Sequence, residues 1–170
     1  MINAHLTHNT ITSNEEEAFS LYEKSRFGEK KQSHIEYSFL EALFLVQEGK
    51  IQVLSAKKQI STQQLIKKAK KQDKRIDIKL VVFSDLRKRG YIVKTALKFG
   101  AEFRVYGKGV KPGEDHALWL LFPVKEHEAL TWYDFAAKNR VATSTKKKLL
   151  IAVVDEESDV TYYEVAWLRP

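Results

Sequence analysis

The sequence of 170 residues contains no cysteine, which excludes disulfide bonds, zinc sites built from thiolates and cysteine nucleophiles. It also lacks any apolar stretch near the ~18 residues that a membrane-spanning helix requires. Its first residues, MINAHLTHNTIT, have neither the basic lead nor the apolar core of a signal peptide. We therefore expect a soluble, cytoplasmic protein with no membrane partner.

Positive charge is in excess, with 29 Lys and Arg against 22 Asp and Glu, so that the chain carries a formal net charge of +7. This excess favours a polyanionic partner. Hydrophobic residues make up 44% of the chain, which is enough for a sizeable core. Helical and extended patterns alternate without an internal repeat or a low-complexity linker. We interpret the chain as two small α/β (α+β) domains, residues 1–80 and 81–170.

The first half predicts a small mixed α/β domain. Weak alternation between residues 4 and 13 indicates one or two strands. Asn14, followed by three glutamates, is typical of a helix start, and that helix should end before Gly28. A second, largely buried helix is predicted to begin at Ser38, and the strand IQVLS follows it.

Residues 57–75 contain eight basic residues and the single acid Asp73. Ser61 is suited to cap a helix, and Leu65 and Ala69 give that helix an apolar side, which leaves a very basic outer face. Two interpretations stay open. The segment is either an ordinary solvated helix or a surface that follows the phosphates of a nucleic acid.

The second half predicts strands arranged around one helix. Tyr106 ends a strand, a loop rich in Gly and Pro follows, and His116 begins the next strand, so the two side chains should face each other across the loop. Lys146, Lys147 and Lys148 lead directly into a strongly apolar run, where a third polar group could join the other two. The expected elements are a helix at 77–89, strands at 91–95, 101–106 and 116–124, a helix at 131–142, and strands at 148–154 and 159–167.

Tyrosine, histidine and lysine together can cleave RNA without a metal or cofactor. The 2′-hydroxyl loses a proton as it attacks the phosphorus, and the 5′-oxygen gains one as it leaves. His116 suits the general acid because imidazole titrates near neutral pH. Lys147 would stabilise the negative phosphorane. For Tyr106 two roles stay open, a general base whose pKa is lowered by cations or a group that positions the attacking hydroxyl.

Three segments, SDLRKRGYIVKTALKFGAEFRVYGKG, GEDHALWLLFPV and STKKKLLIAVVDEESDVTYYEVAWLRP, resemble the archaeal tRNA-splicing endonuclease family in order and spacing over residues 84–170. The resemblance implies a restriction-endonuclease-like, mixed-sheet catalytic domain. It further implies metal-independent excision of introns from precursor tRNA at bulge-helix-bulge motifs, with 2′,3′-cyclic phosphate and 5′-hydroxyl ends. The family's catalytic tyrosine, histidine and lysine fall on Tyr106, His116 and Lys147. Because Lys146 and Lys148 flank Lys147, strand alternation allows only one register.

The same resemblance assigns further residues. Arg140 matches an arginine that the family lays against an unstacked bulge base, although an arginine at a helix C-terminus is the ordinary alternative. An acidic turn matches the family's loop that inserts into another subunit, which implies a homotetramer built as a dimer of dimers. Its ordinary alternative is a solvated hairpin tip. The acidic residues are Asp155, Glu156, Glu157 and Asp159.

Two other functions stay open. One is a non-catalytic RNA-binding or structural subunit that requires a separate catalytic chain. The other is a metal-dependent DNA nuclease, for which Glu114 and Asp115 are the only carboxylates near the predicted site. The leading hypothesis is an RNA endonuclease that acts on precursor tRNA, needs no metal and does not bind DNA.

Overall fold

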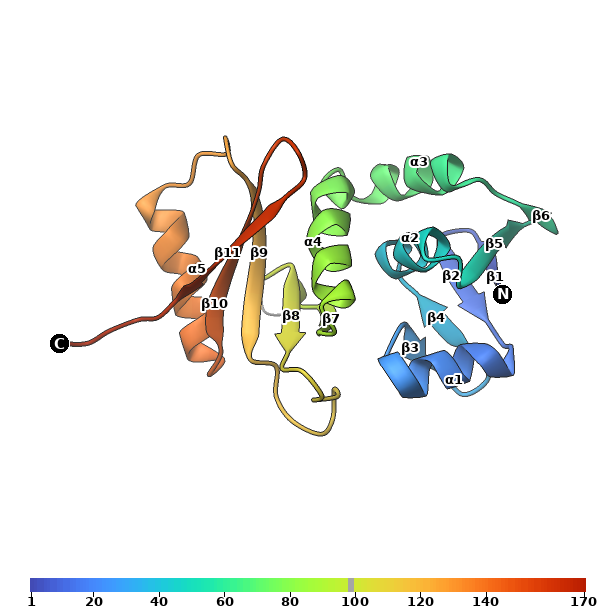
Figure 1. Cartoon of the computed structure of the whole chain (residues 1–170), viewed down its shortest axis with the longest axis horizontal. Helices are drawn as coiled ribbons and strands as arrows, with labels where there is room; N and C mark the ends of the chain where they lie inside the picture. The colour runs from blue at the N-terminus through green and yellow to red at the C-terminus, as the bar shows by residue number, and fades with distance from the viewer. Residues whose placement is uncertain (98–99) are drawn as a thin grey trace. The chain divides into compact units, whose positions relative to one another are not determined.

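The computed structural model describes residues 1–97 and 100–170. Its contacts divide the chain into two compact units, Met1–Leu80 and Val81–Pro170, whose elements are labelled in Figure 1. Each unit combines helices with one mixed sheet, which confirms the predicted α/β class. Across the described ranges, no helix is long and apolar enough to cross a membrane.

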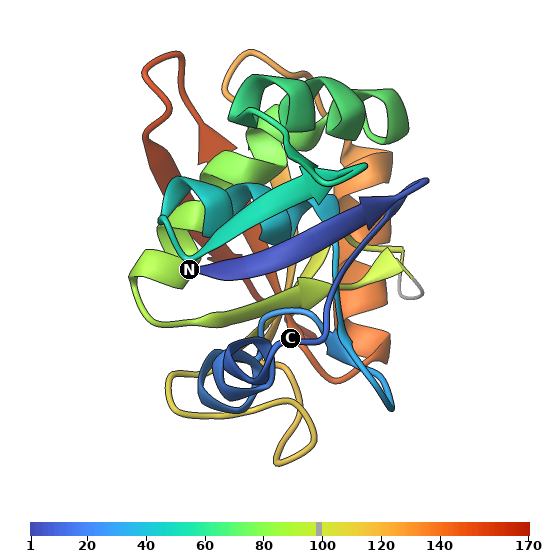
Figure 2. The same ribbon diagram turned by 90° about the vertical axis from the view of Figure 1, so that its right-hand side faces the viewer.

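The sheet of the first unit has the strand order β3-β4-β2-β1-β5-β6. Strands β1 and β5 are parallel and all other neighbours are antiparallel, and Figure 2 shows β1 and β5 running side by side. The strands are β1 (Ile2–Thr7), β2 (Thr10–Ser13), β3 (Glu29–Lys30), β4 (Ile35–Tyr37), β5 (Ile51–Ser55) and β6 (Lys58–Gln59).

Serine caps fix two helices of this unit, α2 (Phe39–Gln47) and α3 (Thr62–Gln72). Ser38 and Ser61 each form a capping box with the residue three positions on, as expected for residues that satisfy the free N–H groups of a first turn. Helix α1 (Glu16–Ser25) begins within the predicted run of glutamates, with Glu16 and Glu17 in its first turn. Its N-cap is Glu15 rather than Asn14, and the Glu15 carboxylate binds the backbone and side chain of Asn3 instead of capping the helix.

The sheet of the second unit has the order β11-β10-β9-β8-β7. Strands β9 and β10 are parallel and joined through a helix, whereas the other pairs are antiparallel. The elements are α4 (Ile76–Lys88), which begins in the first unit, β7 (Ile92–Thr95), β8 (Phe103–Tyr106), β9 (Trp119–Lys125), α5 (Trp132–Ser144), β10 (Lys148–Val154) and β11 (Val160–Val165).

Both faces of this second sheet are covered by helices (Figure 1). Alternate residues of β9 and β10, such as Leu120 and Ile151, form a buried cluster with Ala142 of α5. On the opposite face, the ring of Phe83 in α4 lies 6.2 Å from that of Phe103. Burial on both faces explains why β10 is an almost continuous apolar run.

Strand β9 begins at Trp119, so the prediction that His116 lies in the strand was wrong. The chain from Pro112 to Asp115 closes a turn with a bridge between those two residues, and the Asp115 carboxylate accepts the backbone N–H of His116. Pairing with β8 becomes regular only where Trp119 lies opposite Val105. His116 is therefore a loop residue.

Candidate active site

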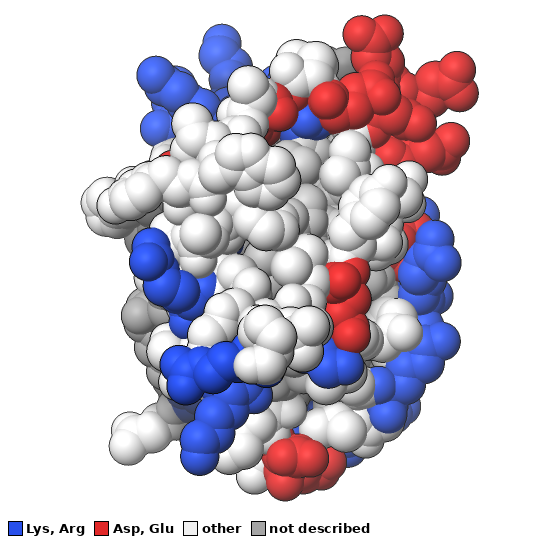
Figure 3. Space-filling view, turned by 90° about the vertical axis from the view of Figure 1, so that its left-hand side faces the viewer, with Lys and Arg blue, Asp and Glu red and all other residues white. Residues whose placement is uncertain are grey.

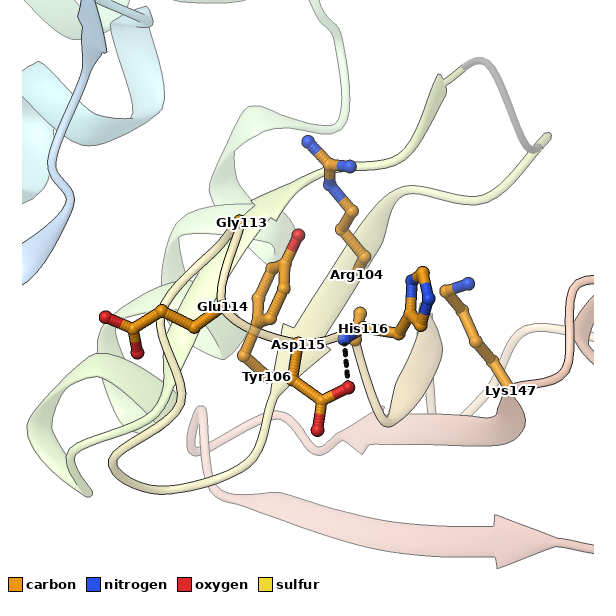
Figure 4. A pocket seen from close by; sticks show the side chains of 8 residues that line it. Arg104, Tyr106, Gly113, Glu114, Asp115, His116 and Lys147 are labelled. Carbon is orange, nitrogen blue, oxygen red and sulfur yellow. Dashed lines mark hydrogen bonds between the residues drawn. The ribbon is translucent and has the colours of Figure 1, made fainter.

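One pocket of about 370 Å³ lies at the end of the second sheet where β9 and β10 begin. Three elements contribute to it: the last residues of β8, the loop before β9, and the turn before β10. Figure 4 shows their side chains around the pocket. The lining residues are Arg104, Tyr106, Gly113, Glu114, Asp115, His116, Ala117 and Lys147. The structure thus brings the predicted Tyr106, His116 and Lys147 to a single site.

Tyr106 is the last residue of β8 and is only 4% exposed. Arg104 is two positions earlier and therefore projects from the same face of the strand. It is half-buried, and its Nε atom has no hydrogen-bond partner in the described residues. Sequence reasoning missed Arg104, although the two-residue period counted back from Tyr106 would have placed it in the site.

His116 is exposed, and two carboxylates of its own loop bond to the backbone of that loop. The Asp115 carboxylate accepts the backbone N–H of His116 at 2.7 Å, and the Glu114 carboxylate accepts that of Lys111 at 3.2 Å. Both carboxylates therefore order the loop backbone. In the described part of the chain, no group of three or more His, Asp or Glu side chains gathers as a metal site would require.

Lys147 is placed by the way in which α5 ends. The backbone N–H of Lys147 donates to the carbonyl of Ala142 at 2.9 Å, and that of Lys146 donates to Thr143 at 3.0 Å. Lys146 has a φ of 56°, so the two bonds form a Schellman motif with a left-handed residue. The Lys147 ammonium group donates to the carbonyl of Thr145 at 3.0 Å, which holds the side chain back along the turn and toward the pocket.

The three adjacent lysines have three different environments, and the predicted strand alternation does not apply to them because β10 begins only at Lys148. Lys146 is exposed in the left-handed turn, Lys147 lines the pocket, and Lys148 is the first residue of β10. Lys148 forms an ion pair with Glu164 on β11 at 2.8 Å. The other oxygen of the same carboxylate accepts the indole N–H of Trp119 at 2.8 Å.

The other predicted residues lie outside this pocket. Arg140 is exposed on α5 and does not line it. The acidic turn joins β10 to β11 at the opposite end of the strands. It is ordered by its own hydrogen bonds, in which the Asp155 carboxylate accepts the N–H of Asp159 at 2.9 Å and Glu126 accepts that of Glu156 at 3.2 Å. Figure 3 shows acidic side chains gathered at one corner of the unit.

Comparison with protein families also separates an N-terminal part of the chain from a C-terminal part. A family model described as tRNA intron endonuclease, catalytic C-terminal domain, matches residues 76–162, and one described as tRNA intron endonuclease, N-terminal domain, matches residues 2–66. The chain belongs to the tRNA intron endonuclease family. It is therefore an enzyme that cleaves RNA, and its pocket lies in the part that matches the catalytic domain.

Relatives match over most of their length. A tRNA-splicing endonuclease of Thermococcus gammatolerans is 39% identical over 170 residues, which covers 99% of each chain. One of Thermococcus onnurineus is 42% identical over 149 residues, 88% of this chain and 85% of the relative. One of Methanothermobacter thermautotrophicus is 38% identical over 150 residues, 88% and 87% of the two chains. The resemblance to the family, read from residues 84–170, is confirmed, and it extends to the N-terminal unit of the chain.

Proposed function

We propose that the chain excises introns from precursor tRNA by cutting at bulge-helix-bulge motifs without a metal. The observation that carries the proposal is the meeting of Tyr106, His116 and Lys147 in one pocket of the catalytic unit. These side chains supply an acceptor or orienting group, a proton donor and a fixed cation. An RNA linkage needs these three when its own 2′-hydroxyl is the nucleophile.

The reaction is an internal transesterification. The 2′-oxygen loses its proton and bonds to the adjacent phosphorus, and the bond from phosphorus to the 5′-oxygen breaks. His116 donates a proton to that departing oxygen, since its exposed imidazole is open to the substrate. The products carry a 2′,3′-cyclic phosphate and a 5′-hydroxyl, and no water is consumed in this step.

Lys147 stabilises the additional negative charge on the phosphorane. Its hydrogen bond to the Thr145 carbonyl holds the ammonium group in position before the substrate arrives, so little reorganisation is needed during the reaction. The Arg104 guanidinium is a second cation in the same pocket.

Tyr106 acts on the 2′-hydroxyl, for which two modes are compatible with its place in the pocket. It either takes the proton, assisted by the neighbouring cations, or orients the hydroxyl while solvent takes the proton. The pH–rate profile separates them, because a Tyr106→Phe variant loses a basic limb of the profile only in the first mode.

Assembly and substrate contact complete the proposal. We assign the acidic turn Asp155–Asp159 to an intersubunit contact in a homotetramer, supported by its exposure and its charge in an otherwise basic chain. Arg140, exposed on α5, is assigned to stacking on an unpaired bulge base. Reversal of the acids to lysine should lower the mass measured by light scattering, whereas a wild-type monomer would contradict the tetramer.

The decisive experiment incubates the purified protein with a short bulge-helix-bulge RNA in excess EDTA and identifies the ends of the fragments. Cuts in both bulges with 2′,3′-cyclic phosphate ends are expected. Cleavage that requires added magnesium would contradict the metal-independent mechanism. The absence of any cleavage would instead indicate a structural subunit that needs a catalytic partner chain.

Variants then assign the roles within the pocket. His116→Ala and Lys147→Ala should each lower the single-turnover rate by about 10²- to 10⁴-fold with RNA binding largely retained. Lys146→Ala is the matched control, because Lys146 is adjacent but does not line the pocket. Wild-type turnover by His116→Ala would remove that residue from the mechanism.

A further inference from the structure

The net charge of the chain is concentrated in one segment of the N-terminal unit. Residues 57–75 contain eight Lys and Arg and one Asp, a net of +7, which equals the net charge of the whole chain. The remaining residues balance at 21 basic and 21 acidic side chains. The excess that favours a polyanionic partner therefore lies in this segment, outside the unit that contains the proposed active site.

Helix α3 holds the backbone of half of these basic residues in a fixed position. The Ser61 capping box holds its first turn, and Leu65 and Ala69, each 1% exposed, are buried on its inner side. The lysines occupy the exposed positions. Because side chains three or four positions apart on a helix lie about 5–6 Å from each other, Lys67, Lys68 and Lys71 form a row on one surface.

The acids near α3 are already paired. Asp73 forms an ion pair with Lys79, and Asp77 forms one with Lys70 at 2.8 Å. Four lysines, three in α3 and one shortly after it, form no ion pair in the part of the chain that the structure describes. We call them the α3 basic surface: Lys67, Lys68, Lys71 and Lys74. Like charges at Lys67 and Lys71 repel each other within the helix, and no ion pair in the described residues offsets this repulsion.

The α3 basic surface lacks the residues that anchor a protein partner or a membrane. Among the described residues, Met1 is the only large exposed hydrophobic side chain of the N-terminal unit, and the others all belong to the second unit. Protein interfaces and membrane-binding helices need apolar anchors in addition to charge. A row of lysines without aromatic or aliphatic neighbours suits a ligand that is charged along its length, which is a nucleic-acid backbone.

We propose that the α3 basic surface binds the phosphate backbone of the RNA substrate, so that the N-terminal unit contributes affinity that is independent of base sequence. The inference rests on the proposed function, because that function supplies the RNA. Lysine contacts phosphate as a point charge and reads no base edge. The contact therefore strengthens binding to any precursor tRNA of suitable length without choosing among them.

The test measures the salt dependence of RNA affinity for the full chain. The quadruple variant Lys67→Gln, Lys68→Gln, Lys71→Gln and Lys74→Gln is compared with a control that removes four exposed lysines elsewhere in the same unit. The control is Lys24→Gln, Lys30→Gln, Lys31→Gln and Lys50→Gln. The ligand is a precursor tRNA with 2′-deoxyribose at both intron boundaries, which binds without being cleaved. Circular dichroism melts verify that both variants are folded.

Loss of four phosphate contacts should lower the slope of log K against log[salt] by roughly 3 and weaken binding at ~0.15 M salt by about 100-fold. The control should retain the wild-type slope, and replacement of the same four lysines by arginine should restore it. Equal losses in the two glutamine variants would mean a diffuse charge effect and would overturn the proposal. An unchanged slope in the α3 variant would overturn it as well.

Cleavage assays keep this proposal distinct from the proposed function. At saturating enzyme, the α3 variant should cleave unmodified precursor tRNA at the wild-type single-turnover rate, since it changes only binding. If the wild-type protein does not cleave, the proposed function fails. If the wild type cleaves while the α3 variant binds with the wild-type slope, only the α3 proposal fails.

Discussion

The Glu164 carboxylate on β11 pairs with Lys148 at the start of β10, with 2.8 Å between Glu164 Oε1 and Lys148 Nζ. Its second oxygen holds the Trp119 indole at the start of β9. Lys148 directly follows Lys147, and Trp119 comes three residues after His116. One carboxylate therefore ties together the first residues of β9 and β10, the strands that follow His116 and Lys147 of the proposed active site.

Glu164→Ala is expected to slow cleavage more than it destabilises the fold. Both partners of the Lys148 ion pair are substantially exposed, so the pair contributes little to stability. A small displacement of Lys147 or His116 costs rate, and we expect a single-turnover rate about tenfold lower with RNA affinity retained. Thr161→Ala, an exposed change on the same strand, is the control. In a Lys147→Ala background the Glu164 effect should shrink, whereas additive losses would mean that Glu164 does not act through Lys147.

The same carboxylate predicts a pH dependence of stability. The hydrogen bonds from Lys148 and then Trp119 lower the pKa of Glu164 below its ordinary value. A lowered pKa in the folded state gives a contribution that is present above the ordinary carboxyl pKa of about 4.3 and is lost as pH falls through the lowered value. Melts of the wild type and Glu164→Gln should therefore differ slightly at pH 7 and converge near pH 3. A difference that grows toward acid would have the wrong sign.

Lys146→Gly is expected to stabilise the catalytic unit. The φ of 56° at Lys146 is strained for a side chain with a Cβ atom and unstrained for glycine. Part of the gain is offset by the greater freedom of glycine in the unfolded chain, which leaves about 0.5–1 kcal/mol. Denaturant unfolding measures the change. Lys146→Ala retains the strain and should not stabilise, so equal effects of the two substitutions would refute the explanation.

Tyr162→Phe is expected to destabilise the protein by about 1 kcal/mol, the usual loss for one hydrogen bond. The Tyr162 hydroxyl donates to Asp85 on α4 at 2.7 Å and links that helix to β11. Burial, followed by the bond to Asp85, raises the pKa of Tyr162 well above its ordinary value. Asp85 retains Arg89 at 2.8 Å, so its charge stays compensated in the variant. Thermal unfolding is the measurement, and an unchanged midpoint would contradict the link.

Arg104→Ala is expected to lower cleavage by about 100-fold, as for loss of one group that stabilises developing charge. Arg104→Lys should recover part of this activity by restoring the cation without the guanidinium geometry. Lys94→Ala is a suitable control, because Lys94 lies opposite Arg104 on β7 but does not line the pocket. Single-turnover rates measured over a range of enzyme concentrations separate the two effects: a loss that persists at saturating enzyme concerns chemistry, and one that disappears there concerns binding.

Much of the fold follows from local signals. Ser38 and Ser61 cap helices as predicted, because the capping pattern is complete within four residues. The bounds of β10, Lys148–Val154, were also predicted, since burial on both faces gives an unbroken apolar run. The N-cap of α1 is Glu15, whose carboxylate bonds to Asn3 on another element, and no local pattern indicates that contact.

The finer structure of the site depends on distant contacts. The position of Lys147 depends on how α5 terminates, and a left-handed Lys146 has no sequence signature comparable to glycine. The contact between Trp119 and Glu164 spans 45 positions in the sequence, so no local pattern indicates it. The roles of Tyr106 and His116 remain predictions that rest on the family resemblance and on the shared pocket.

The parallel pairing of β9 and β10 places the pocket and the acidic turn at opposite ends of the same strands. Seven residues of β10, about 20 Å of extended chain, separate the two ends, a distance more than twice the screening length of physiological salt. Changes in the length or charge of the loops at residues 126–130 and 155–159 should therefore have little effect on the electrostatic potential at the pocket. Under the proposed assembly, in which the acidic turn contacts another subunit, such changes would alter the intersubunit contact and leave the proposed active site unchanged.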